Sequence, residues 1–324
     1  MRTSLVILAA LTAAAATSVF ADRQQTLDAA LALAEANYPD QLELHVNQPE
    51  ETHDVILTIK DDPITRIRFS VDSNPADCKA GSACEERLHK AYAQGVAAGV
   101  KLKAVNTAMN SCGVRPVAVE GAANTTQFRL VVERDLHAAD AQQQLDELTA
   151  CLSDFRNALP EDATQQQRSI ALRIVKPQGG ETASGPLTFE QQWSEEQQNQ
   201  VSYLLGAGPE ETQLSTAQLR LDPTYLASRE QREHFSKVAR EALKDRDAQA
   251  HVPPLSRPWQ SQLDPQQPNL LQTHILACSE QQAEDCRPDT AVRLQYDLSK
   301  GAVVEQTVLR DVVNEAGWVN LPAY

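Results

Sequence analysis

The sequence is poor in aromatic residues, which make up 5% of its 324 positions, and after residue 21 it lacks any apolar run of membrane-spanning length. About 20 apolar residues are needed to cross a bilayer, so we expect no inserted helix in the mature chain. Motifs of common enzymes are also missing: G-x-S-x-G, S-x-x-K, H-E-x-x-H, the Walker loop, G-x-G-x-x-G and the EF-hand loop. We therefore expect no catalytic residue, cofactor or metal, although catalytic groups can also come from scattered positions.

Basic residues are few relative to acidic ones: 29 Lys and Arg stand against 44 Asp and Glu, a formal charge of −15. Such a field repels phosphate backbones and anionic lipid surfaces, so we expect neither nucleic acid nor a membrane as partner. A protein with a basic surface is the natural complement. Acidity can also serve solubility alone.

The first 21 residues have the pattern of a secretory signal peptide. Arg2 is followed by the uncharged apolar run SLVILAALTAAAA, and Val19 and Ala21 occupy the small-residue positions before a cleavage site. We predict a mature chain that begins at Asp22, has a charge of −16 after the loss of Arg2, and is periplasmic or secreted.

The sequence contains six cysteines, an even number that in an exported protein indicates disulfide bonds. Proximity in the sequence favours three pairs, namely Cys78 with Cys84, Cys112 with Cys151, and Cys278 with Cys286. The short first ring should stabilise the fold less than the longer loop of the second pair, because loop-closure entropy grows with length. Zinc is the alternative for the first pair, but its spacing differs from the C-x2-4-C pattern of structural sites.

Hydrophobic periodicity predicts alternating helices and strands in the first half of the chain. The expected elements are a helix at 24–39, strands at 42–46, 53–60 and 64–72, a helix at 84–109, strands at 115–121 and 126–134, and a helix at 138–159. In the third strand apolar residues alternate with Arg66 and Arg68, which indicates an antiparallel sheet with one face in solvent.

A polar, proline-containing stretch at 161–168 predicts a linker between two domains, 22–160 and 169–324. In the second domain we expect a strand at 168–175, a loop at 177–186, a helix at 194–206, a strand at 217–221, a helix at 228–245, an irregular proline-rich crossing at 252–269, and strands at 273–279, 291–298 and 303–313. Ser194 and Gln197 form a capping box at the start of the helix at 194–206.

Two stretches, 125–148 and 215–238, run from a strand through a leucine into a glutamine-bearing helix. A duplicated unit would explain this likeness, and so would a chance similarity of two amphipathic hairpins. The sequence as a whole predicts an α+β protein: two small domains, each an antiparallel sheet with helices, stapled by disulfides.

Histidines supply the only candidates for acid–base or metal chemistry. His45 and His53 fall on adjacent predicted strands and would face each other across a hairpin, with Asp54 and Asp62 nearby. A solvated strand face is the simpler interpretation, and we expect His274 to be structural.

Two tryptophans are candidate partner-binding residues. Trp259 lies in the proline-rich crossing and Trp318 lies near the end of the sequence. An aromatic side chain on a rigid loop presents a large contact area at low entropic cost. The alternative is that each tryptophan packs its own loop onto the core.

These observations favour an exported, non-enzymatic binding protein. The sharpest version is an inhibitor or immunity-type protein that neutralises a basic protein partner. Two alternatives are a periplasmic hydrolase with catalytic residues outside known motifs, and a structural or assembly factor of the cell envelope.

Overall fold

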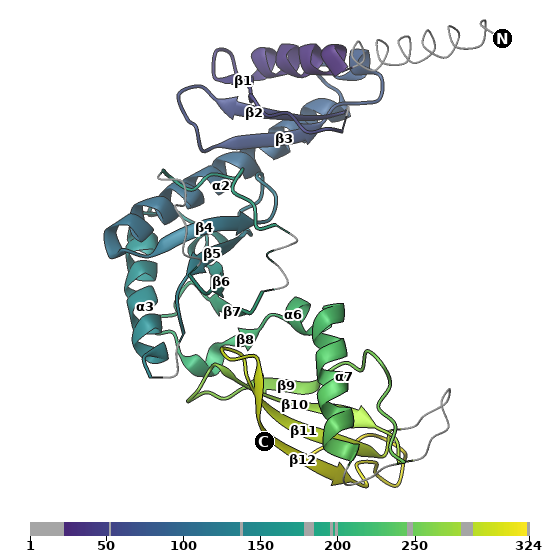
Figure 1. Cartoon of the computed structure of the whole chain (residues 1–324). Coiled ribbons are helices and arrows are strands. Elements are labelled where there is room, and N and C mark those ends of the chain that lie inside the picture. Colours follow the sequence, from purple (N-terminus) through teal and green to yellow (C-terminus); the bar gives the residue numbers. More distant parts are fainter. Residues whose placement is uncertain are drawn as a thin grey trace, which may run out of the picture.

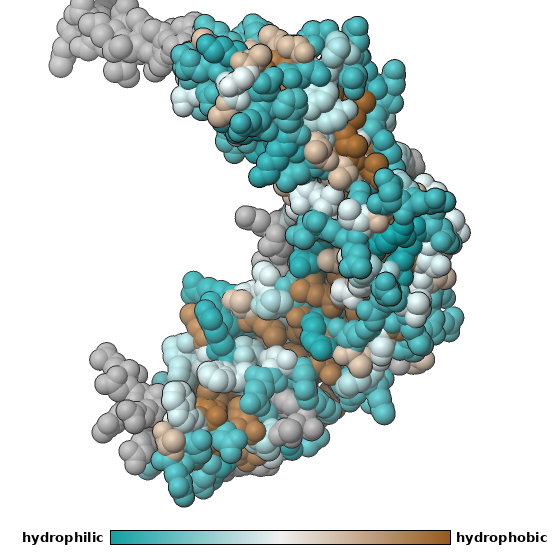
Figure 2. Space-filling model, turned by 180° about the vertical axis from the view of Figure 1, so that it is seen from behind, coloured by the Kyte–Doolittle hydropathy of each residue, from teal (hydrophilic) through white to brown (hydrophobic). Residues whose placement is uncertain are grey.

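A computed structural model shows an α+β protein with sheets of three, five and four strands (Figure 1). It describes residues 23–51, 53–136, 139–177, 185–194, 197, 200–244, 249–279 and 288–322. The three sheets follow one another along a bent molecule (Figure 1). Seen from behind, the surface is largely hydrophilic, and hydrophobic residues gather where the middle and C-terminal parts meet (Figure 2).

The N-terminal sheet matches the sequence prediction. A helix runs through residues 23–37 and is followed by three strands, β1 (Leu42–Leu44), β2 (Asp54–Ile59) and β3 (Arg66–Ser70). The strands pair in order and are antiparallel, with Val55 opposite Phe69. Both side chains are buried in a separate hydrophobic cluster between the sheet and its helices.

The long helix α2 (Ala83–Cys112) joins the N-terminal sheet to the middle of the molecule. A short 3-10 turn, η1 (Pro75–Asp77), precedes it, and Ser82 caps its first turn by accepting a hydrogen bond from the Glu85 N–H. Leu88 belongs to the N-terminal cluster, whereas Leu102 belongs to the large central core. The helix ends at Gly113, whose φ of 67° is favourable only for residues such as glycine.

The five-stranded sheet forms the middle of the molecule. Its strands in spatial order are β4 (Arg115–Glu120), β5 (Arg129–Glu133), β6 (Ile170–Val175), β7 (Ser202–Ala207) and β8 (Arg220–Leu221). Between β5 and β6 the chain forms α3 (Ala141–Asn157) and α4 (Gln165–Arg168). Because of this helical connection β5 and β6 are parallel, whereas the other pairs of this sheet are antiparallel.

The predicted linker at 161–168 falls between β5 and β6 of the middle sheet. Residues on both sides of this stretch supply neighbouring strands of one sheet, and the stretch itself contains α4. Within α2, the buried residues of the N-terminal cluster end at Ala91 and those of the central core begin at Ala98. The five-stranded sheet is also mixed rather than antiparallel.

The predicted helix at 194–206 is wrong over its second half, which forms strand β7. Tyr203, Leu205 and Ala207 alternate into the central core, a period of two that fits a strand. The predicted capping pair is nevertheless present, because the Gln197 N–H donates to Ser194 Oγ at 3.3 Å. The predicted contact between Ser194 and Gln197 is thus present, whereas the apolar run that follows forms a strand.

The C-terminal part is an antiparallel sheet with a helix on one face. The chain passes through η2 (Thr216–Gln218), α6 (Pro223–Ala227) and α7 (Arg229–Lys244) into four strands, β9 (Trp259–Leu263), β10 (Leu270–Ala277), β11 (Thr290–Asp297) and β12 (Ala302–Arg310). Phe235 of α7 packs against Tyr296 of β11 with ring centroids 5.0 Å apart. Both belong to the core that also fills the middle sheet.

The proline-rich stretch at 252–269 is not wholly irregular, because it contains β9, which pairs with β10.

The two stretches of similar sequence, 125–148 and 215–238, have different surroundings in the structure. In the first, β5 lies inside the middle sheet, whereas in the second, β8 is the last strand of that sheet and α7 packs on the C-terminal one.

Two predicted disulfides are confirmed. Cys78 pairs with Cys84 across a Cα distance of 5.0 Å, and Cys112 at the end of α2 pairs with Cys151 on α3 across 5.5 Å. Cys278 is also disulfide-bonded, and its predicted partner Cys286 lies outside the described residues. The predicted signal peptide, 1–21, lies outside them too. In the part of the chain that is described, no helix is long and apolar enough to cross a membrane.

Candidate partner-binding groove

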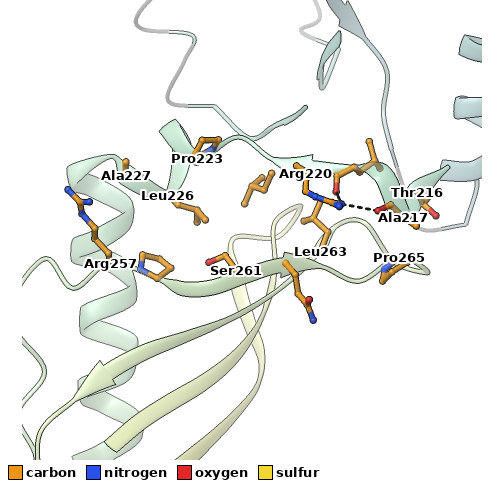
Figure 3. Close-up of a pocket in the computed structure, with 14 residues that line it drawn as sticks. Thr216, Ala217, Arg220, Pro223, Leu226, Ala227, Arg257, Ser261, Leu263 and Pro265 are labelled. Atoms are coloured by element: carbon orange, nitrogen blue, oxygen red, sulfur yellow. Dashed lines mark hydrogen bonds between the residues drawn. The ribbon is translucent and has the colours of Figure 1, made fainter. Parts of the chain in front are cut away.

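The edge strands of two different sheets border one groove. β8 is the last strand of the five-stranded sheet and β9 is the last strand of the four-stranded sheet. Between them lies a groove with a volume of about 640 Å³ (Figure 3). It is lined by Thr216, Ala217, Leu219, Arg220, Leu221, Pro223, Leu226, Ala227, Arg257, Pro258, Ser261, Gln262, Leu263 and Pro265. Edge strands present backbone groups that lack a neighbouring strand, and such edges are places where other chains add.

The register of each edge strand fixes which backbone groups point outward. The Asp222 N–H donates to Ser202 O at 2.9 Å, which makes these residues a hydrogen-bonded pair. Antiparallel pairs alternate, so the N–H and C=O of Leu221, opposite Tyr203, point away from β7. On β9, the Asp264 N–H donates to Leu270 O at 3.0 Å.

By the same alternation, the backbone groups of Leu263 point away from β10. Leu263 lies directly opposite Leu271, next to the hydrogen-bonded pair of Asp264 and Leu270. Leu221 and Leu263 both line the groove. Among the described residues, no backbone hydrogen bond joins β8 to β9. The N–H and C=O of Leu221 and of Leu263 thus have no backbone partner among the described residues.

The wall on the β8 side is held by a buried carboxylate. Asp222 Oδ1 accepts a hydrogen bond from the Thr224 N–H at 2.8 Å and caps α6, and Pro223 follows at the first helical position. The other carboxylate oxygen of Asp222 pairs with the buried guanidinium of Arg173, which also contacts Glu120 at 2.6 Å. The turn from β8 into α6 is thus fixed to the interior of the middle sheet.

The β9 wall is bent by its local backbone. Gln260 has a φ of 47°, and the pairing with β10 shifts register between Gln272 and His274. Such a bulge increases the local twist of a strand and re-aims its side chains. Trp259, opposite His274, precedes the bulge and is not one of the residues that line the groove.

Two arginines give the groove a positive lining in an acidic protein. Arg220 Nη1 donates to Ala217 O at 2.9 Å and to Leu219 O at 2.8 Å, and no hydrogen bond to a described residue uses its Nε or Nη2. Arg257 lies at a different position along the groove (Figure 3). Neither arginine forms an ion pair with a described carboxylate, and no lining residue is acidic.

Both candidate tryptophans are exposed, and neither belongs to a described hydrophobic cluster. Trp259 is 47% exposed on β9, and Trp318 is 73% exposed. Trp318 lies in a tight turn in which its N–H donates to Asn314 Oδ1 at 2.9 Å. Their exposure favours the predicted role in partner binding, and that role stays a prediction.

The predicted histidine pair does not form. His45 donates its backbone N–H to Ile56 O, whereas the His53 carbonyl accepts from Val71, so the two residues lie at different places in the sheet. His45 Nε2 instead lies 2.7 Å from Glu190 Oε1. Burial, together with the charge of Arg66, lowers the pKa of His45 despite the opposing effect of Glu190.

The same oxygen of Glu190, Oε1, also accepts a hydrogen bond from Arg66 Nε at 2.9 Å. A cavity of about 450 Å³ adjoins the three side chains. Its walls come from the N-terminal sheet and from residues 121–123 and 189–192. The arrangement ties two parts of the molecule together, and its carboxylate is already neutralised by a guanidinium.

A buried lysine borders the largest cavity described, about 730 Å³. Burial lowers the pKa of Lys101 to about 8, a shift often seen at catalytic lysines. Here, however, its Nζ donates to the carbonyl oxygens of Thr126, Gln166 and Ser169. All three protons of the ammonium are thus used within the fold, and the cation fixes the C-terminal end of α4.

Metal binding has no support in the described part of the chain, where no cluster of three or more His, Cys, Asp or Glu is placed to hold an ion. Cys78 and Cys84 are joined in a disulfide, which removes the zinc alternative.

The sequence predicted no role for Arg220 or Arg257, and it did not predict strand β9, which lies between prolines. The alternation in WQSQL was a signal for that strand, but flanking prolines outweighed it.

No family model, curated protein sequence or solved structure matches this chain.

Proposed function

We propose that this protein is an exported, non-enzymatic binding protein whose partner is another protein. The observation that carries the proposal is the groove between β8 and β9, bordered by two strand edges, together with the exposure of Trp259 on β9. Strand edges supply main-chain hydrogen bonds to an incoming chain, and tryptophan is among the residue types that dominate binding energy.

The charge of the chain supports a partner with a basic surface. A net charge of −15, or −16 without the predicted leader, attracts a basic protein over distances longer than direct contact. An inhibitor or immunity-type protein would use such attraction to capture its target quickly. Disulfides are compatible with export, and a periplasmic location is part of the proposal.

The groups with the strongest claim to chemistry are engaged in the fold, which favours binding over catalysis. Lys101 donates to three carbonyls, and Glu190 is paired with Arg66. A binding surface needs no such free acid or base.

The proposal is tested by purifying the tagged chain from its native organism at low ionic strength, beside a Trp259→Ser variant. We expect one basic protein at a stoichiometric ratio, and we expect the variant to lose at least about tenfold in affinity. Trp259 is exposed, so the variant should fold normally, as circular dichroism will show. Absence of a stoichiometric partner, or equal retention by the variant, would contradict the proposal.

A further inference from the structure

We propose that the groove between β8 and β9 binds an extended segment of a partner protein that carries acidic side chains. The inference rests on the proposed function and adds the chemistry of the segment. Three observations carry it: the sign of the charges that line the groove, the backbone groups of its edge strands that have no backbone partner, and the apolar side chains in its lining.

Arg220 and Arg257 supply the positive charge of the groove lining. Both are exposed, both line the groove, and neither has a described carboxylate partner. Acidic residues outnumber basic ones by 44 to 29 in this chain, so partners for a surface arginine are abundant. A groove with two unpaired guanidinium groups and no acidic lining is complementary to carboxylates, which accept their N–H donors in charge-assisted hydrogen bonds.

Leu221 and Leu263 lie on the edge strands of their sheets, and their N–H and C=O groups face away from the neighbouring strand. A chain that lies along either edge in an extended conformation can pair with these groups as an added strand. A helix cannot, since its own backbone groups are satisfied internally. The occupant is therefore extended.

Apolar side chains lie between the two arginines. Pro223 and Leu226 lie between Arg257 and Arg220 in the view of Figure 3, and Pro258 also belongs to the lining. In an extended segment, successive side chains point to opposite sides. Acidic residues that alternate with apolar ones would thus direct carboxylates toward the guanidinium groups while other side chains cover the apolar lining.

A partner that is basic overall is consistent with this local chemistry. Net charge acts over roughly a Debye length, about 8 to 10 Å at physiological salt, and governs the rate of encounter. Groove contacts act within hydrogen-bond distance and select the segment that enters. The partner is then a basic protein with an acidic extended segment.

A peptide-binding measurement tests the inference on the full chain. The probe is an end-capped, fluorescein-labelled octapeptide that alternates Glu and Val, and the comparison probes carry Gln or Lys in place of Glu. We expect anisotropy to show binding of the Glu peptide only. Arg257→Gln and Arg220→Gln should each weaken it by about tenfold or more, as expected for the loss of a charge-assisted hydrogen bond.

Arg240→Gln is the matched control. This arginine is exposed on α7 outside the groove lining, and the variant makes the same change in net charge. It should bind the Glu peptide as the wild type does. Hydrogen exchange supplies a second readout, because a bound strand should slow exchange of the Leu221 or Leu263 amide.

Several results would overturn the inference. Equal binding of the Gln or Lys peptide would remove the role of charge, and unchanged binding by both groove variants would place the peptide elsewhere. Self-association of the chain that Arg257→Gln abolishes would make a second copy the occupant. A partner that depends on Trp259 while the Glu peptide fails to bind would refute the acidic segment and leave the proposed function intact.

Discussion

Arg66 Nε lies 2.9 Å from Glu190 Oε1, although 124 positions separate the two residues in the chain. The contact joins the N-terminal sheet to the segment that covers the edge of the middle sheet, where the Val119 N–H donates to Gln191 O. Arg66 is buried, so its charge relies on this carboxylate.

Glu190→Gln should therefore destabilise the protein by about 1 to 2 kcal/mol, since Glu190 itself is partly exposed and solvent screens the pair. Chemical denaturation measures the loss. Glu241→Gln on the exposed face of α7 is the control and should leave the free energy of unfolding unchanged. A Glu190→Gln variant as stable as the control would show that the contact does not contribute.

Close packing of α2 on β3 predicts a sensitive glycine. A Cβ at Gly95 would lie 2.3 Å from the backbone oxygen of Arg66, so the helix would have to move away from the sheet. We expect Gly95→Ala to cost about 1 to 3 kcal/mol. Gly206→Ala on β7, where a Cβ meets nothing within 4 Å, should be neutral or stabilising. Equal melting temperatures for the two variants would contradict this packing.

The two described disulfides should contribute unequally to stability. Their sequence separations are 39 residues for Cys112–Cys151 and 6 residues for Cys78–Cys84. Loop-closure entropy then predicts losses of about 4 and about 2 kcal/mol for the respective double alanine variants. Thermal unfolding of both variants gives the order, and a larger loss from the shorter ring would contradict it.

Two histidines should make stability fall on acidification. Burial, with the charge of Arg66, lowers the pKa of His45, and burial, with the charge of Arg293, lowers that of His274. The unfolded chain then takes up protons near the ordinary pKa of about 6.5 before the folded state does. Their contribution is complete above that pH and is lost as the pH falls.

Urea unfolding between pH 7.5 and 5 measures this slope. The variant that carries both His45→Gln and His274→Gln should lose part of the slope, whatever its absolute stability. The exposed His53→Gln variant should keep it. An identical slope in both variants would assign the pH dependence to other groups.

Strong local patterns made most of the fold predictable. The helix at 23–37, strands β1 to β6, α2, α3, α7 and strands β10 to β12 all follow from hydrophobic periodicity, and the contact between Ser194 and Gln197 was predicted as well. The sheet partners did not follow, because the pairing of β5 with β6 depends on contacts across α3 that no local pattern encodes.

The candidate groove was only partly predictable, for the same reason. Trp259 was recognisable by its residue type. The groove, in contrast, forms between the edge strands of two different sheets, which are not neighbours in the sequence. Arg220 and Arg257 gave no signal of their own, since an exposed arginine is ordinary until its neighbours are known. Strand β9 was not predicted, because the prolines on either side of its five residues favour irregular structure.

The acidity of the chain predicts that association with its partner depends on salt. Raising ionic strength from about 0.05 to about 0.5 M shortens the Debye length from roughly 14 to roughly 4 Å. The association rate should fall by about an order of magnitude, and the dissociation rate should change less. Stopped-flow mixing with the purified partner measures both rates. An association rate indifferent to salt would mean that the charge serves solubility.

Site-specific photo-crosslinking shows directly whether the groove between β8 and β9 holds a protein partner. A benzophenone amino acid replaces Gln262, which is exposed and lines the groove, or Lys237, which is exposed on α7 away from it. After irradiation in the native organism, we predict one defined protein adduct from position 262 and none from position 237. Adducts from both positions alike, or none from position 262, would contradict the account.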